Sequence, residues 1–348
     1  MRENVLIISS SSDAHISFVA EKLRGLGVHV FRLNTETLGA GGSLSMCIEY
    51  PIKRKIGGRI QLATDQQEFS LDEIGSVWYR RPKSPDLSNF HLSPEGLAFA
   101  RDEWRAALNG LYSLLNEALW VSHPDRLHIG ENKLLQLRTA KELGFTIPST
   151  LVTNDKQAVL EFWHHFGGSV VAKPIGLGWV YVQDGGEKEL VRSVMTNEID
   201  QAALEDLDNL QIAPAIFQEA VPKLYELRIS VVGHEVFTAR IDSQESEISR
   251  VDWRRYDLEH TPYSIYRLPE NIEGLCKQLV ALLGLQFGAI DMIRRPDGEY
   301  VFLEINCNGQ FAWVEELTGL PISEALARLL AGLSSPIGAL PASFKERR

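Results

Sequence analysis

The sequence has few cysteines and no long hydrophobic run. Only three of its 348 residues are cysteines (Cys47, Cys276 and Cys307), and none forms a CxxC pair. An odd number of scattered cysteines excludes the disulfide framework of small secreted proteins. No stretch approaches the roughly 20 apolar residues of a membrane span, and Met1–Ser12 lacks the pattern of a secretion signal. These absences favour a protein of the reducing cytoplasm.

Several common functional signatures are also missing. The formal charge of -11 argues against a general affinity for nucleic acid, which usually shows as clustered Lys and Arg. The nine histidines show no metal-binding spacing, so zinc is not expected. Neither GxSxG nor a Cys-His arrangement indicates a covalent nucleophile. The first loop, which follows Val5–Ile8, also lacks GxGxxG and therefore the dinucleotide fingerprint.

The pattern of apolar residues predicts an α/β protein of several modules. The first module, residues 1–120, begins as strand, helix and strand, which implies a parallel pair. Short strands and a long amphipathic helix complete it. The expected elements of this module are Val5–Ile8, Ala14–Leu26, Val28–Leu33, Leu44–Tyr50, Ile60–Leu62, Val77–Tyr79 and Pro94–Leu119.

Two further modules are expected at 121–217 and 218–335, followed by a tail at 336–348. Gly144 is placed to end a helix over Lys133–Leu143 as a C-cap. Gly233-His234 predicts a hairpin turn between strands Leu227–Val232 and Val236–Ile241. A helix over Ile272–Leu283 then leads into the segment that carries the strongest chemical signal.

That segment, Ile290–Asn306, reads as two strands around Asp297-Gly298, a dipeptide favoured in two-residue hairpin turns. A tight turn there places Asp291 directly opposite Glu304, with Asn306 on the same face. Two opposed carboxylates repel each other unless a cation or a shared proton neutralises them. Two acids and an amide suit Mg²⁺.

The same segment has a second interpretation, in which it is a surface hairpin. Its acids would then pair with Arg294 and Arg295 rather than with a metal. The register leaves Ile290, Met292, Val301, Leu303 and Ile305 on the opposite, apolar face in either case.

Three groups of residues resemble motifs of ATP-grasp ligases. The metal-binding end of that superfamily is similar to Asp291 with Leu303–Gln310. Its two nucleotide lysines are similar to Lys133 and Lys173 in Glu131-Asn132-Lys133 and Val171-Ala172-Lys173-Pro174. Its adenine-binding hinge is similar to Phe217-Gln218-Glu219-Ala220-Val221.

A narrower resemblance, from about residue 4 to 330, is to the microviridin-type ligases, also called graspetide synthetases. It is carried by Val77-Trp78-Tyr79-Arg80-Arg81-Pro82, Phe145-Thr146-Ile147-Pro148-Ser149-Thr150, Val251-Asp252-Trp253-Arg254 and the Glu304–Gln310 ending. The resemblance implies an ATP-grasp fold with an N-terminal pre-ATP-grasp domain (1–120), a linker helix and small α/β lobe (121–217) and a C-terminal lobe with the metal site (218–335).

The resemblance also implies roles for individual residues. ATP is expected with Mg²⁺, two ions in number, held by Asp291, Glu304 and Asn306. Arg228, Arg240 and Arg254 are expected to be catalytic, with Arg228 and Arg240 sharing the transferring phosphate or the acyl phosphate; the alternative is that they form salt bridges to Asp242 or Glu226. The nucleotide is expected to contact Lys133, Lys173, Gly176, Gly178, Glu219, Val221, Glu226 and Asn306.

The function implied is ATP-dependent activation of Asp or Glu side chains in a ribosomal precursor peptide, followed by joining to Ser or Thr hydroxyls or Lys amines. Two alternatives remain: a ligase that adds a free amino acid such as glutamate to a peptide or protein, and a nucleotide-binding regulator without catalysis. The expected partners are a precursor with a leader segment and a second copy in a homodimer, with neither nucleic acid nor membrane. The acidic helix Gln201–Leu210 is one hypothesis for leader recognition.

Overall fold

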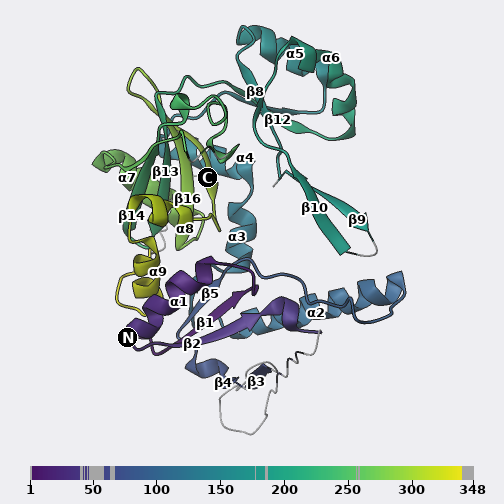
Figure 1. Cartoon of the computed structure of the whole chain (residues 1–348), viewed down its shortest axis with the longest axis vertical. Helices are drawn as coiled ribbons and strands as arrows, with labels where there is room; N and C mark the ends of the chain where they lie inside the picture. Colours follow the sequence, from purple (N-terminus) through teal and green to yellow (C-terminus); the bar gives the residue numbers. More distant parts are fainter. Residues whose placement is uncertain are drawn as a thin grey trace.

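The structure is a computed structural model that describes residues 2–39, 42, 44, 46, 59–62, 67–176, 178–184, 187–255, 257 and 259–338. Most of the expected strand Leu44–Tyr50, including Cys47, lies outside these residues, as does the tail from residue 339. Figure 1 shows an N-terminal sheet at one end of the molecule and, at the other, two lobes beside each other. A helical segment, α3 Pro124–Gly130 and α4 Lys133–Leu143, joins the two ends.

The N-terminal sheet is parallel and has the strand order β2-β1-β5-β6. Alternate residues of β1 face opposite sides, as the pleat requires. Val5 and Ile7 pack with helix α1, whereas Leu6 and Ile8 pack with helix α2. The elements are β1 Asn4–Ser9, α1 His15–Gly25, β2 His29–Asn34, β5 Ser76–Tyr79, α2 Pro94–Leu114 and β6 Leu119–Val121, with a separate antiparallel pair β3 Arg59–Leu62 and β4 Gln67–Ser70.

Helix α2 ends five residues before the predicted Leu119. The residues from Leu119 to Val121 instead form β6, which pairs in parallel with β5. The indole of Trp120 donates a hydrogen bond to the carbonyl of Leu115, 2.9 Å away, and so fixes the sharp exit from the helix. Strand pairing therefore overrode the helical period of the apolar residues, a tertiary effect that local pattern does not reveal.

The smaller of the two lobes contains a four-stranded sheet of order β11-β8-β12-β7, covered by helix α5. The predicted helix Gln201–Leu210 is only partly α-helical, because it continues as the 3₁₀ helix Asp206–Ile212. The elements are β7 Thr150–Thr153, α5 Lys156–His165, β8 Val170–Lys173, β11 Asn197–Glu198, α6 Gln201–Glu205 and β12 Ala215–Glu219, with the projecting hairpin of β9 Trp179–Asp184 and β10 Glu187–Ser193.

The larger lobe is an antiparallel sheet of order β15-β14-β13-β16-β17. One face of the sheet packs against α4 and α7 through Leu227, Ile229, Ile290 and Met292. The elements are β13 Tyr225–Val232, β14 Glu235–Ile241, β15 Tyr263–Ile265, α7 Glu270–Leu282, β16 Phe287–Arg294, β17 Tyr300–Asn306, α8 Ala312–Thr318 and α9 Ile322–Leu330. The two-residue turn at Gly233-His234 is confirmed, since Val232 pairs with Glu235.

Helices α3 Pro124–Gly130 and α4 Lys133–Leu143 connect the N-terminal sheet to the two lobes (Figure 1). Helix α4 begins at the predicted residue, where the Asn132 side chain accepts a hydrogen bond from the Leu135 amide. It ends at Gly144, whose φ of 101° is the left-handed C-cap expected from the sequence. Among the residues described above, no helix combines the length and apolar character needed to cross a membrane.

Candidate active site

The hairpin of β16 and β17 places Asp291 directly opposite Glu304, as predicted, but by a different route. The turn is not the tight two-residue turn expected. Arg295 and Glu299 are joined by an amide-to-carbonyl hydrogen bond of 2.9 Å, so three residues form the loop, with Gly298 at a φ of 98°. A register shift at the level of Asp291 and Met292 then restores the pairing of the two acids.

The extra residue in β17 is Leu303, which leaves the apolar face. Met292 pairs with Phe302 rather than with Leu303, and Phe302 is fully buried in the core. Leu303 lines a cavity between the two lobes, beside Glu304. The sequence had predicted it on the apolar face, opposite the acids. The bulge thus adds an apolar side chain to the site next to its acids.

Asp291 is held by Arg228, its cross-strand neighbour on β13. The Arg228 Nη1 atom donates to both carboxylate oxygens, at 2.9 and 2.8 Å. Asp291 is 6 % exposed and Glu304 8 %, so the interpretation of a surface hairpin is wrong. The arginines named in it lie elsewhere: Arg295 pairs with Asp297 and Glu299, and Arg294 stacks on Tyr300.

Asn306 completes the predicted set of three ligands. Its Nδ2 atom lies 2.9 Å from Asp291 Oδ2 and 3.4 Å from Glu304 Oε1. The nitrogen and oxygen of an amide are assigned from its hydrogen-bond partners, and a cation between the carboxylates would favour the flipped amide. The three side chains therefore converge on one point.

Three cationic side chains surround the carboxylate of Glu304. Burial alone would raise its pKa, but the charges of Arg254, Lys133 and Lys173 outweigh burial and hold the pKa at about 2. Lys133 Nζ is 3.7 Å from Glu304 Oε2, and Arg254 Nη1 is 3.4 Å from Oε1. Burial, together with the Glu304 charge, raises the pKa of Asp291 despite Arg228. The surrounding cations therefore favour the ionised form of Glu304 more than that of Asp291.

The two acids face a cavity of about 290 Å³ between the two lobes, whereas Lys133, Arg228 and Asn306 are not among its lining residues. Seven of the predicted site residues line it: Lys173, Glu219, Val221, Glu226, Arg254, Asp291 and Glu304. Lys133 reaches Glu304 and also donates to the carbonyls of Pro174 and Gly176, at 2.9 and 3.3 Å. It therefore ties the loop of Gly176 and Gly178 to the larger lobe, although neither glycine is among the residues that line the cavity.

Arg240 does not join this group. The register pairs Arg240 with Leu227, so it points to the face opposite Arg228, which pairs with Ala239. Its guanidinium lies over the Tyr225 ring at 4.1 Å and binds Asp242. The prediction that Arg228 and Arg240 share one anion is therefore wrong. Arg240 pairs with Leu227, the residue before Arg228, and consecutive residues of a strand face opposite sides of the sheet. The salt bridge to Asp242 was the alternative.

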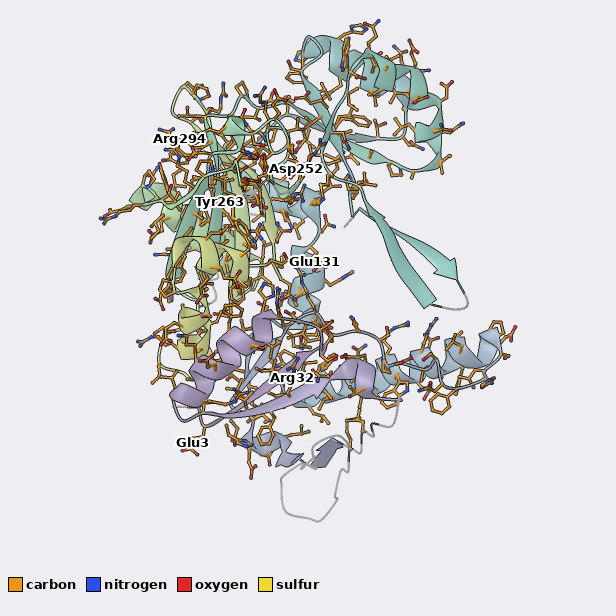
Figure 2. The ribbon with its side chains drawn as sticks, in the orientation of Figure 1. Glu3, Arg32, Glu131, Asp252, Tyr263 and Arg294 are labelled. Atoms are coloured by element: carbon orange, nitrogen blue, oxygen red, sulfur yellow. The ribbon has the colours of Figure 1, made fainter. Side chains whose placement is uncertain are left out.

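Two ion pairs fix the far wall of the cavity. Arg254 donates to Asp252 at 2.7 and 2.9 Å. Burial opposes ionisation of Asp252, but Arg254 lowers its pKa to about 2. Figure 2 places Asp252 where the smaller lobe meets the five-stranded sheet. Glu226 is bound at 2.9 Å by Lys223, although burial still raises the Glu226 pKa.

Lys223 is a residue that sequence reasoning missed. Its ammonium group also donates to the carbonyls of Arg250 and Val251, so it anchors the loop that carries Asp252 and Arg254. Only long-range contacts reveal this role, because nothing distinguishes Lys223 locally from a solvated lysine.

A buried network from the N-terminal sheet was also missed. Arg80, 1 % exposed, follows β5 and donates to the carbonyl of Asn308, in the loop after Asn306. Its Nε atom lies 3.4 Å from Asp13, which in turn binds His15 at 2.9 Å. Arg80 lies in the Trp-Tyr-Arg-Arg-Pro stretch, the one signal by which the sequence could have pointed to it. The N-terminal sheet thus supports the loop that follows the predicted metal ligands.

Gly309 allows this loop to approach the site closely. A Cβ atom there would lie 2.5 Å from Ala289 Cβ and 2.8 Å from Arg228 Nη2. We expect Gly309→Ala to displace Arg228 and Asn306 and to lower the unfolding free energy by about 1–3 kcal/mol, the usual cost of overpacking. Chemical denaturation measures this effect.

Gly274→Ala is the matched control, because its Cβ would meet nothing within 4 Å. Since Gly274 lies inside α7, alanine should stabilise the protein by about 0.5–1 kcal/mol. Equal stability changes in the two variants would contradict the close packing of Gly309.

The pKa of Lys173 yields a second prediction. Burial lowers that pKa to about 8. The charge of Lys133 lowers it further, whereas the charge of Glu304 opposes the shift. Lys173 is charged below this value and neutral above it, so the affinity for ADP should fall about tenfold between about pH 7 and about pH 9. Titration calorimetry across this range measures the change, and Lys173→Arg should remove most of it. An equal pH dependence of ADP affinity in Lys173→Arg would show that titration of Lys173 is not its cause.

Comparisons with known proteins give matches over nearly the whole length. Residues 4–128 match the family model described as the MvdD pre-ATP grasp domain. The macrocyclase MdnC from Microcystis aeruginosa MRC, solved with its precursor peptide MdnA, is 32% identical with a TM-score of 0.80, and the match covers 95% of this chain and 100% of MdnC. A RiPP-associated ATP-grasp ligase from Chryseobacterium gregarium, in complex with ADP and a leader and core peptide, is 31% identical with a TM-score of 0.85 over 97% and 100%.

A more distant relative is the alpha-aminoadipate–LysW ligase LysX from Sulfurisphaera tokodaii, which is 23% identical over 201 residues. The match covers 57% of this chain and 66% of LysX, about two thirds of that protein.

Proposed function

The chain belongs to the RiPP-associated ATP-grasp ligases, and from that premise we propose that it activates Asp or Glu side chains of a ribosomal precursor peptide as acyl phosphates and joins them to Ser or Thr hydroxyls or Lys amines. One observation carries the proposal. The buried, opposed pair Asp291 and Glu304 faces the same cavity as Lys173 and Arg254, and Lys133 lies 3.7 Å from Glu304. Such a set of charges suits a metal-bound polyphosphate.

The residues present fit Mg²⁺ by donor chemistry. Among the described residues, no group of three His, Cys, Asp or Glu side chains could hold a metal. The protein offers two carboxylates and one amide instead, and Mg²⁺ commonly takes one or two protein carboxylates and completes its shell with phosphate oxygens and water. We propose that Asp291, Glu304 and Asn306 hold two ions in this way, only when nucleotide is present.

The cations of the cavity then act on the phosphates. When bound, Mg²⁺ would neutralise charge on the phosphate oxygens. Lys133 and Lys173 would bind the same phosphates as point charges, and Arg254 would stabilise the charge that develops on the transferred phosphoryl group. Glu219, Val221 and Glu226 would hold the adenine and ribose. Arg228 has a positioning role, because its contacts are with Asp291 and the Gln310 carbonyl.

The reaction has two steps that need no protein nucleophile. A carboxylate oxygen of the peptide attacks the γ-phosphorus of ATP, and the bond to ADP breaks. A hydroxyl or amine of the same peptide then attacks the acyl carbon, loses its proton and expels phosphate. The product is an ester or amide crosslink, with the loss of one water overall. The work of the protein is positioning and electrostatic stabilisation.

A ligase that joins a free amino acid to a protein is the second candidate, supported by the match to LysX. The full-length matches to ligases solved with precursor peptides favour the peptide crosslink. A cytoplasmic location and a homodimer complete the proposal as further predictions, together with leader recognition by the exposed acidic residues Glu205, Asp206 and Asp208.

Mass spectrometry tests the proposed function. The protein is incubated with ATP, Mg²⁺ and a synthetic peptide rich in Asp, Glu, Ser, Thr and Lys, and ADP is measured in parallel. We expect the peptide to lose one water per crosslink, with one ADP formed for each. A gain of mass in the presence of free glutamate would support the second candidate instead, and nucleotide binding without ADP formation would support a regulator.

A further inference from the structure

The N-terminal sheet carries a second cavity, of about 210 Å³, that the proposed function does not use. One wall is the part of α2 that contains Arg101, Trp104 and Arg105, and the other is the segment from Pro82 to Leu87 that follows β5. We call this cavity the α2 groove. Its remaining lining residues are Thr35, Tyr79, Leu108, Asn109 and Tyr112.

The α2 groove lies where parallel sheets usually bind ligands. Thr35 directly follows β2, and Pro82 comes three residues after the end of β5. Both positions are outside the carboxyl ends of parallel strands, where the crevices of open α/β sheets receive their ligands. The hydroxyl of Thr35 donates to the carbonyl of Lys83 at 2.5 Å, so the wall of the groove is tied to the sheet.

Its chemistry is aromatic inside and basic outside. Tyr79 and Tyr112 form an edge-to-face pair with centroids 5.5 Å apart, and Trp104 adds a third ring to the lining. Lys83, Arg101 and Arg105 are exposed, whereas none of the described lining residues is acidic. This is notable in a chain with a formal charge of -11.

Nearby acids offset only part of this charge. Asp86 belongs to the wall segment but is not a lining residue, and its carboxylate accepts a hydrogen bond from the Ser88 amide at 2.9 Å. Arg105 pairs with Asp102 at 2.8 Å, but both side chains are about two thirds exposed, so the pair contributes little. The carboxylate of Glu36 faces Lys83 but binds the Ser11 amide at 2.6 Å. The groove therefore keeps a positive character that suits a carboxylate-rich ligand.

One end of the α2 groove adjoins the active site. The carbonyl of Tyr79 accepts a hydrogen bond of 3.4 Å from Asn308, in the loop that follows Asn306. Helix α2 also projects from the sheet on the side toward which the β9–β10 hairpin extends (Figure 1). A peptide whose carboxylate reaches the nucleotide cavity could therefore continue into the groove.

We propose that the α2 groove binds an acidic segment of the peptide substrate and so presents neighbouring carboxylates to the active site. The inference rests on the proposed function, which requires a peptide that bears Asp or Glu side chains. The aromatic rings contact the peptide backbone and aliphatic carbons, and Lys83, Arg101 and Arg105 pair with carboxylates.

Fluorescence anisotropy with labelled deca-glutamate, on the full chain with ADP and Mg²⁺ at low salt, tests the inference. The wild type should bind deca-glutamate and bind deca-glutamine at least tenfold more weakly. Arg101→Glu/Arg105→Glu should weaken deca-glutamate binding about tenfold or more, because attraction becomes repulsion. Lys83→Glu, on the opposite wall, should act in the same direction.

Lys22→Glu/Arg24→Glu is the matched control, since it makes the same change in net charge on exposed residues of α1. It should change the affinity less than about twofold. Equal weakening in both double variants, or none in the groove variants, would overturn the inference.

ADP affinity, measured on the same samples, separates this inference from the proposed function. Groove variants should keep wild-type ADP affinity, which also shows that they are folded. Failure of the wild type to bind ADP would contradict the proposed function. Intact ADP binding without deca-glutamate binding would contradict the α2 groove alone.

Discussion

Glu304→Gln is expected to lower the rate of ADP formation and crosslinking by about a thousandfold. The substitution keeps the shape of the side chain but removes the charge that offsets Arg254 and Lys133 and that would bind the metal. Loss of one electrostatic contact in a catalytic site commonly costs about 10²–10³-fold. The assay compares initial rates of ADP release and crosslinked product.

Glu299→Gln is the control, because Glu299 is exposed, directly precedes β17 and lies outside the cavity. It should keep nearly the wild-type rate. A Glu304→Gln enzyme that is within about tenfold of wild type would mean that phosphoryl transfer does not depend on this carboxylate.

Arg228→Met should destabilise the protein by about 3–5 kcal/mol, because it leaves the buried carboxylate of Asp291 without its partner. Urea unfolding gives the change in free energy. The double variant Arg228→Met/Asp291→Leu should recover much of the loss, since replacing both buried charges removes the unpaired one.

The matched control is Arg138→Met, which breaks an exposed pair with Glu142 on α4. Its cost should be below about 1 kcal/mol. An Arg228→Met variant as stable as Arg138→Met would show that Asp291 is not confined to a buried pair.

Local sequence patterns predicted those parts of the fold that depend on neighbours along the chain. Helix α4 with its Gly144 cap and the Gly233-His234 turn were predicted to the residue, because capping and tight turns are set by a few adjacent side chains. The end of α2 was not, because Leu119–Val121 becomes a strand only by pairing with β5.

The site was predictable where two strands meet and unpredictable where distant segments converge. The opposition of Asp291 and Glu304 followed from the hairpin, even though the bulge at Leu303 and the three-residue turn were both unforeseen. Arg240 was misplaced because a shift of one position reverses the face of a strand. Arg80 and Lys223 act across the fold, and local patterns carry no information about such contacts.

The most direct test of the account is the fate of oxygen in the reaction. The peptide is prepared with isotopically heavy oxygen in its Asp and Glu side chains, and the released phosphate is examined by mass spectrometry. If this cavity activates the carboxylate as an acyl phosphate, one heavy oxygen should appear in phosphate for each crosslink formed. If crosslinks form but the released phosphate contains no heavy oxygen, activation through an acyl phosphate is contradicted.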